Sequence, residues 1–164
     1  MSDVEIIKGY APGVIGRVTE LHASYYRQHW DFGLFFEAKV ATELASFLEH
    51  YDEHRDGIWV VRADGSIEGS IAIDGARAAT EGAALRWYLM SGDFRGQGVG
   101  QRLIETAIAF CSACRYGSVY LWTFEGLDAA RHVYEKNGFR LAEQRSGTRW
   151  GREVNEQRFV LDLS

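Results

Sequence analysis

Glycine, arginine and glutamine gather in one short stretch whose residue types suit phosphate binding. The stretch runs Arg95-Gly96-Gln97-Gly98-Val99-Gly100-Gln101. Apolar residues over 83–89 predict a strand before it, and apolar side chains at helical spacing over 103–114 predict a helix after it. A glycine-rich turn at such a junction can hold a phosphate group. Glycine lets the backbone come close, and the first N–H groups of a helix have no partner within the helix.

Two common phosphate-binding patterns do not fit this turn. A Walker loop needs Lys and then Ser or Thr after its last glycine, but Gln101 and Arg102 follow Gly100. The dinucleotide pattern Gly-x-Gly-x-x-Gly, counted from Gly98, places its third glycine at Leu103. What remains is Arg95-x-x-Gly98-x-Gly100, a pattern that an ordinary strand–helix turn can also carry.

The two cysteines form a short C-x-x-C pattern but predict no redox or metal site. Cys111 and Cys114 fall on the expected inner face of the helix after the loop. Buried cysteines act mostly as small apolar side chains. No second pair of cysteines or histidines completes a zinc site, so we expect no metal.

Length and composition favour a single globular domain over residues 1–164. The chain is 46% hydrophobic, and its formal net charge is −5 without a cluster of Lys or Arg. Nucleic-acid partners need a basic patch, so we expect none. The sequence has no long apolar run, and its acidic start lacks the pattern of a signal peptide. We therefore expect a cytoplasmic protein with no membrane partner.

The remaining chain predicts an α/β fold with helices on both faces of a mixed sheet. Further strands are expected over 4–8, 58–62, 67–73, 118–124, from 139 onward and over 159–163, and further helices over 14–29, 36–51 and 128–137. The order is β-α-α-β-β-β-α-β-α-β-β, with about seven strands. The strands on either side of the loop helix should be parallel, because a helix connects them.

A second motif follows one strand after the loop helix. Residues 130–139 read Ala-Arg-His-Val-Tyr-Glu-Lys-Asn-Gly-Phe. Together with the glycine loop and the order of elements, they resemble the GCN5-related N-acetyltransferase (GNAT) superfamily over most of the chain. The N-terminal half, with Phe35-Phe36-Glu37 and Asp64-Gly65-x-Ile67-x-Gly69, also resembles the acetyltransferase domains fused to MarR-type regulators.

This resemblance implies the GNAT fold and an acyltransferase that moves an acetyl group from acetyl-CoA directly to an amine, through a tetrahedral intermediate. Backbone amides of the loop would bind the diphosphate, with Arg95 in support, and an N–H of Leu89 or Met90 would face the acetyl carbonyl. Tyr134 stands at the family's tyrosine position and would protonate the departing thiolate. The implied cofactor-binding residues are Leu89, Met90, Arg95, Gly96, Gln97, Gly98, Val99, Gly100 and Gln101.

The resemblance leaves the acceptor side of the site open. Relatives often carry an acidic residue where this chain has Ala84, so the base can be Glu81, Glu37 or a chain of water molecules. Arg86 can grip a carboxylate of the substrate or form a surface ion pair, and we expect it on the face opposite Trp87 because strand residues alternate.

Several alternatives complete the expectations. Leu127 replaces an asparagine that often contacts the cofactor in relatives, so a coenzyme A-binding sensor without turnover is the second hypothesis. His22 and His29 should pack at the edge of the core rather than act in catalysis. The strand over 159–163 can pair across the edge of a homodimer.

Overall fold

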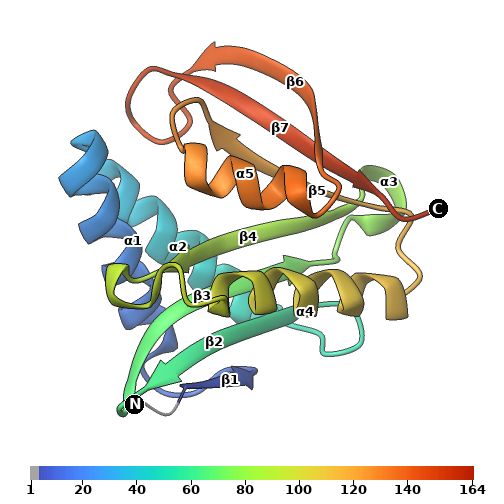
Figure 1. Ribbon diagram of the computed structural model, residues 1–164, viewed down its shortest axis with the longest axis horizontal. Helices are drawn as coiled ribbons and strands as arrows, with labels where there is room; N and C mark the ends of the chain where they lie inside the picture. The colour runs from blue at the N-terminus through green and yellow to red at the C-terminus, as the bar shows by residue number, and fades with distance from the viewer. Residues whose placement is uncertain (1–3) are drawn as a thin grey trace.

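Residues 4–164 form one seven-stranded sheet with helices on both faces (Figure 1), as the computed structural model of the protein describes them. The strands are β1 (Val4–Lys8), β2 (Gly57–Ala63), β3 (Ser66–Asp74), β4 (Ala83–Met90), β5 (Ser118–Phe124), β6 (Arg140–Gly147) and β7 (Val154–Asp162). The helices are α1 (Val14–Trp30), α2 (Leu34–Glu49), α3 (Ala78–Glu81), α4 (Val99–Ala113) and α5 (Asp128–Lys136), and η1 (Gly92–Phe94) is a 3₁₀ turn. The predicted fold class and element order are confirmed. The short α3 and η1 were not predicted, because three or four residues show no periodicity.

The strands lie in the order β1-β2-β3-β4-β5-β7-β6. Neighbours are antiparallel except β4 and β5, which are parallel as the intervening helix predicts. β7 is hydrogen-bonded to β5 on one side and to β6 on the other. Phe159 and Val160 are therefore paired on both sides and lie at no free edge, which corrects the suggestion of a dimer contact there. β6 does not pair beyond Val160, so the suggestion stays a prediction for residues 161–163.

β4 and β5 separate after a very short stretch of pairing. Only Ala83 with Val119 and Ala84 with Tyr120 are partners across this boundary. From there to their carboxyl ends the two strands share no ladder, so their facing N–H and C=O groups are left without strand partners. The sheet thus opens next to the start of α4.

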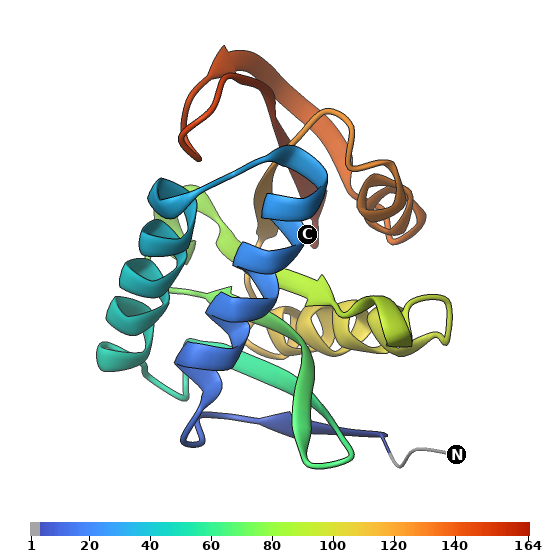
Figure 2. The same ribbon diagram turned by 90° about the vertical axis from the view of Figure 1, so that its left-hand side faces the viewer.

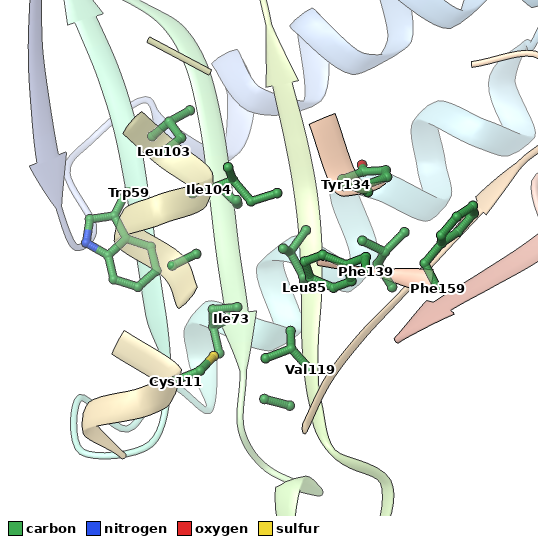
Figure 3. Packing of buried hydrophobic residues seen from close by; sticks show 14 of the residues in the cluster. Trp59, Ile73, Leu85, Leu103, Ile104, Cys111, Val119, Tyr134, Phe139 and Phe159 are labelled. Carbon is green, nitrogen blue, oxygen red and sulfur yellow. The ribbon is translucent and has the colours of Figure 1, made fainter. Parts of the chain in front are cut away.

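Two apolar clusters fix the helices against the sheet. On one face α4 and α5 pack through Leu103, Ile104, Cys111 and Tyr134, and the Tyr134 ring packs on Phe159 of β7 (Figure 3). On the other face α1 and α2 lie side by side (Figure 2) and bury the side chains Val14, Val18, Phe36, Val40 and Leu44. In α4 the face predicted from the apolar spacing over 103–114 is the face that the structure buries, through Leu103, Ile104, Ala107 and Cys111.

A β-bulge interrupts β4 just before the cleft. Its register against β3 shifts between Ser70 and Ala72, and Trp87 has a left-handed φ of 49°. The Ser70 hydroxyl donates a 2.6 Å hydrogen bond to the Trp87 carbonyl, which holds the bulge in place. Such a bulge adds one residue and resets the alternation of side chains.

The bulge corrects the expectation that Arg86 and Trp87 point to opposite faces. Arg86 forms an ion pair with Glu43 of α2, and the Trp87 ring packs on Phe47 of the same helix, with ring centroids 5.4 Å apart. Both side chains therefore turn toward α2.

Cys111 and Cys114 supply a first testable prediction, on stability. Cys111 is fully buried and burial raises its pKa to about 12, with Cys114 adding to the shift, so it stays a neutral thiol. We expect Cys111→Ser to lower the free energy of unfolding by about 1–3 kcal/mol, because it buries a hydroxyl in an apolar cluster. Denaturant unfolding measures this change.

The matched control is Cys114→Ser, since Cys114 is only partly buried. We expect it to change the free energy of unfolding by less than about 0.5 kcal/mol, and neither variant to change turnover. A loss of turnover in Cys114→Ser would contradict the structural role and point to redox chemistry.

No helix within residues 4–164 has the length and apolar character that crossing a membrane requires. Over the same residues, no group of three or more His, Cys, Asp and Glu side chains is arranged to hold a metal ion.

Candidate active site

A cleft of about 1140 Å³ runs through the opening between β4 and β5. Residues of both strands line it, together with the loop after β4 and parts of α1, α2 and α5. Its volume exceeds the roughly 300–1,000 Å³ of an ordinary small-molecule pocket, so it suits a long ligand or two ligands side by side. The glycine loop and the tyrosine motif, which are 35 residues apart in sequence, meet at this cleft.

The glycine loop presents bare backbone to the cleft. Gly96 and Gly98 have φ values of 79° and 80°, and a Cβ atom on either would meet nothing within 4 Å. Gly98 is the N-cap of α4, and no side chain caps this helix end. The first N–H groups of α4 therefore have no helix partner, and they add the positive end of the helix dipole. This cradle fits a diphosphate.

The predicted loop residues divide into two groups. Arg95, Gly96, Gly98, Gly100 and Gln101 line the cleft. Val99 instead is buried against the core, and the Gln97 side chain folds back to donate a 2.9 Å hydrogen bond to the Asp93 carbonyl. The last two residues can contribute only their backbone to a ligand in the cleft.

Arg95 ties the loop to two other elements. Its Nε donates a 3.1 Å hydrogen bond to the Met90 carbonyl at the end of β4. Its guanidinium also lies over the ring of Tyr25 in α1, 4.3 Å from the centroid. Leu89 and Met90 line the cleft beside it. Arg95 thus positions the loop in addition to offering charge.

Two further contacts, which sequence reasoning missed, hold the start of α4. The Tyr88 hydroxyl donates a 2.8 Å hydrogen bond to the Gly100 carbonyl. The side-chain amides of Gln101 and Asn137 bond reciprocally at 2.9 and 3.0 Å, joining α4 to the end of α5. Each pair joins distant elements, and only the inclusion of Asn137 in the 130–139 motif hinted at such a role.

Tyr134 lies in the cleft wall formed by α5. It is 6% exposed, and its ring packs on Phe139 and Phe159 at centroid distances of 5.9 and 6.2 Å (Figure 3). It also packs on Tyr88, at a centroid distance of 5.9 Å. Burial raises the pKa of its phenol well above the ordinary value, with smaller contributions from Tyr26 and Tyr88. The hydroxyl therefore stays protonated and available as a donor.

The structure separates the candidate residues on the acceptor side. Glu37 is exposed and lies outside the cleft, which corrects the suggestion that it faces an acceptor. One helical face carries Phe36, Val40 and Glu43, so Glu43 is the α2 carboxylate that reaches the cleft. Glu81 lies at the rim, where it pairs with Arg77 at 3.2 Å.

Glu43 is shared by two cations. Arg86 pairs with one of its oxygens, and Lys39 lies 2.7 Å from the other. Burial alone would raise the pKa of Glu43, but the hydrogen bonds from Lys39 and Arg86 outweigh it and lower the pKa. Arg86 therefore forms an ion pair, as one of its two alternatives had it, but this ion pair lies in the cleft. Binding of a substrate carboxylate by Arg86 stays a prediction.

The helix α1 contributes both of its histidines to the cleft wall. His22 is 5% exposed, as expected for a side chain packed in the core. His29 is exposed and its ring lies 4.5 Å from that of Tyr25.

Comparison with known proteins gives one family and one fold. The sequence profile described as the acetyltransferase (GNAT) family matches residues 16–139. A GNAT-family acetyltransferase from Staphylococcus aureus Mu50 is 18% identical, with 99% of this chain and 100% of that chain covered and a TM-score of 0.81. The putative acetyltransferase yncA from Salmonella typhimurium, solved with its cofactor acetyl-CoA, is 16% identical over 99% and 95% of the two chains, with a TM-score of 0.77. No curated protein matches the chain in sequence.

Proposed function

Because the chain belongs to the acetyltransferase (GNAT) family, we propose that it transfers the acetyl group of acetyl-CoA directly to the amine of an acceptor in the cleft between β4 and β5. The observation that carries this proposal is the placement of an uncapped, glycine-lined helix start and a buried protonated tyrosine on one cleft. Direct transfer needs a diphosphate anchor and a proton donor together, and this cleft offers both.

The loop would hold the coenzyme A diphosphate through backbone N–H groups of Gln97 to Gln101. Gly96 and Gly98 leave room for the phosphate oxygens, since side chains there would occupy open space in front of the loop. Arg95 adds positive charge close by. Bound in this way, acetyl-CoA would supply a thioester that is already activated, so no protein nucleophile is needed.

In the transfer step the amine nitrogen attacks the thioester carbonyl, and the carbonyl oxygen becomes negative. The N–H of Leu89 or Met90, at the end of β4 where β5 no longer pairs with it, would donate to that oxygen. The C–N bond forms, the C–S bond breaks, and the Tyr134 hydroxyl donates a proton to the departing sulfur. Glu81, at the rim, and water remain possible acceptors for the proton that the amine loses.

Turnover is tested by incubating the protein with acetyl-CoA and a broad panel of amines while free thiol is followed. We expect thiol release that depends on the amine, together with binding of coenzyme A measured by calorimetry. Amine-dependent thiol release supports the transferase. If no thiol is released, the binding measurement shows whether the protein still binds coenzyme A.

The alternative function is a coenzyme A-binding sensor without turnover. Ala84 and Leu127 favour it, because both line the cleft with side chains that can neither hydrogen-bond nor take a proton. Tight binding of coenzyme A without thiol release for any amine would support the sensor and contradict the transferase.

Three finer expectations stay predictions. These are the kinship of the N-terminal half with domains fused to MarR-type regulators, the formation of a homodimer, and a cytoplasmic location. One domain over residues 1–164, without a metal cofactor, is likewise part of the proposal.

A further inference from the structure

One buried imidazole has a defined orientation beside the cleft. His22 Nδ1 lies 2.8 Å from the Val18 carbonyl, one turn earlier in α1. A carbonyl oxygen can only accept a hydrogen bond, so Nδ1 carries the hydrogen and donates it. In the neutral ring Nε2 then holds a free lone pair. His22 is thus an acceptor at Nε2.

Nε2 of His22 remains open to the cleft. No hydrogen bond within residues 4–164 involves this atom. The buried side-chain nitrogen and oxygen atoms that lack a partner in the same residues are Thr19 Oγ1 and Ser91 Oγ, so Nε2 is not sealed in the core. Since His22 itself lines the cleft, the accessible side of Nε2 is the cleft side.

Tyr26 connects His22 with the opposite wall. The two rings stack with centroids 6.5 Å apart and an interplanar angle of 17°. Tyr26 is also close enough to Tyr134 to contribute to the raised pKa of that phenol. Tyr26 therefore lies beside His22 on α1 and within electrostatic range of Tyr134 on α5.

The surroundings keep the imidazole neutral. Burial lowers the pKa of His22 to about 4, and the hydrogen bond to Val18 opposes this shift only in part. The titratable and charged groups around this wall are Tyr25, Tyr26 and His29 on α1, Arg95 over Tyr25, and Tyr134 on α5, and none of them contributes to the shift. Nε2 is therefore free of a proton at neutral pH.

Three of the four carboxylates that line the cleft within residues 4–164 are engaged elsewhere, and the fourth, Asp128, is exposed at the start of α5. Glu43 is bound by Lys39 and Arg86, and Glu81 by Arg77. Asp74 accepts a 3.0 Å hydrogen bond from the N–H of Ala76. Glu43, Glu81 and Asp74 thus each already have a partner on at least one carboxylate oxygen, whereas no partner occupies Nε2.

We propose that Nε2 of His22 accepts the N–H of the acceptor amine and takes its proton during acetyl transfer. This inference rests on the proposed transferase function. As the C–N bond forms, the nitrogen becomes positive and its proton passes to Nε2, while the thiolate receives a proton from Tyr134. The imidazolium then returns one proton, through water, to the Tyr134 phenolate. One amine hydrogen has thus been exchanged for the sulfur hydrogen of coenzyme A, and the enzyme is unchanged.

The test replaces His22 with asparagine, whose side-chain NH₂ can still donate to the Val18 carbonyl while Nε2 is lost. We expect kcat to fall about 10- to 100-fold, at the low end of acid–base effects because a base of low pKa is a weak one. The KM for acetyl-CoA should not change. Above pH 5 the wild-type kcat should show no step from His22, whereas the kcat of His22→Asn should rise with pH as hydroxide replaces the missing base.

The matched control is His50→Asn. His50 makes the same bond, with Nδ1 2.8 Å from the Ser46 carbonyl one turn earlier, but it is exposed and lies outside the cleft. This variant should keep the wild-type kcat and pH profile. A His22→Asn enzyme that is folded and has the kcat and pH profile of His50→Asn overturns the inference.

A measurement on the wild-type protein covers the case in which His22→Asn does not fold. The imidazole ¹⁵N resonances of His22 should report a protonated Nδ1 and an unprotonated Nε2, and the Nε2 resonance should move when an accepted amine binds together with coenzyme A. An Nε2 resonance that is already protonated, or that no amine moves, contradicts the inference. Absence of thiol release from the wild type with any amine would instead contradict the transferase itself.

Discussion

Gly98→Val is expected to weaken the binding of acetyl-CoA at least ~100-fold, which corresponds to about 2.7 kcal/mol. Gly98 has a φ of 80°, a region in which a β-branched residue is strained by roughly 1–3 kcal/mol. Relief of that strain would turn the first N–H groups of α4 away from the ligand. The valine side chain would also enter the open space in which we place the diphosphate. Calorimetric titration with coenzyme A measures the loss, and circular dichroism confirms that the variant is folded.

The control for this prediction is Gly92→Val. A Cβ on Gly92 also meets nothing within 4 Å, but its φ is not left-handed and it does not line the cleft. We expect its affinity for coenzyme A to stay within about twofold of the wild type. Equal affinities for Gly98→Val and Gly92→Val would remove the loop from the cofactor site and with it the basis of the proposed function.

Tyr134→Phe is expected to lower kcat about 10- to 100-fold with little change in the KM for acetyl-CoA. The change removes only the hydroxyl, which is the proposed proton donor to the sulfur, and a thiolate leaving group needs limited help. The phenyl ring keeps its packing on Tyr88, Phe139 and Phe159, so the free energy of unfolding should change by less than about 0.5 kcal/mol. Initial rates of thiol release and thermal unfolding measure the two quantities.

The direction of the Tyr134 pKa shift adds a pH test. Because burial raises the pKa of Tyr134, the hydroxyl holds its proton throughout the working range of the enzyme. At pH values below 10, the wild-type kcat should therefore not decrease through loss of this proton. A falling limb between pH 8 and 9 that disappears in Tyr134→Phe would contradict this assignment.

Tyr116→Phe is the matched control for the loss of a phenolic hydroxyl. Tyr116 donates a 2.7 Å hydrogen bond to the Arg55 carbonyl and lies outside the cleft. Its removal should cost stability without lowering kcat. If Tyr134→Phe also keeps the wild-type kcat, Tyr134 serves packing alone and the sulfur receives its proton from solvent.

Features carried by neighbouring residues could be predicted from the sequence. The strand, the glycine turn and the helix over 83–114 follow each other directly, and their periodicity and glycine content are local properties. The same holds for Tyr134, which lies within a ten-residue motif. The order of elements and the parallel pairing of β4 with β5 also followed, because a helical connection leaves few alternatives.

Features that depend on contacts between distant segments could not be predicted. The β4 bulge depends on the bond from Ser70 to Trp87, and it reversed the expected direction of one side chain. The choice of Glu43 over Glu37 depends on how α2 rotates against the sheet. The place of β7 between β5 and β6 depends on its hydrogen bonds with both strands, and β5 is distant from it in sequence.

The sequence by itself therefore determined the glycine loop, the motif that carries Tyr134 and the fold, since each is encoded by residue types at short spacing. Only the tertiary structure decided what surrounds the acceptor. It joined Nδ1 of His22 to the Val18 carbonyl and engaged Glu43, Glu81 and Asp74 in ion pairs and hydrogen bonds. The physical reason is that burial and hydrogen bonding set the chemistry of a titratable group, and both come from parts of the chain far away in sequence.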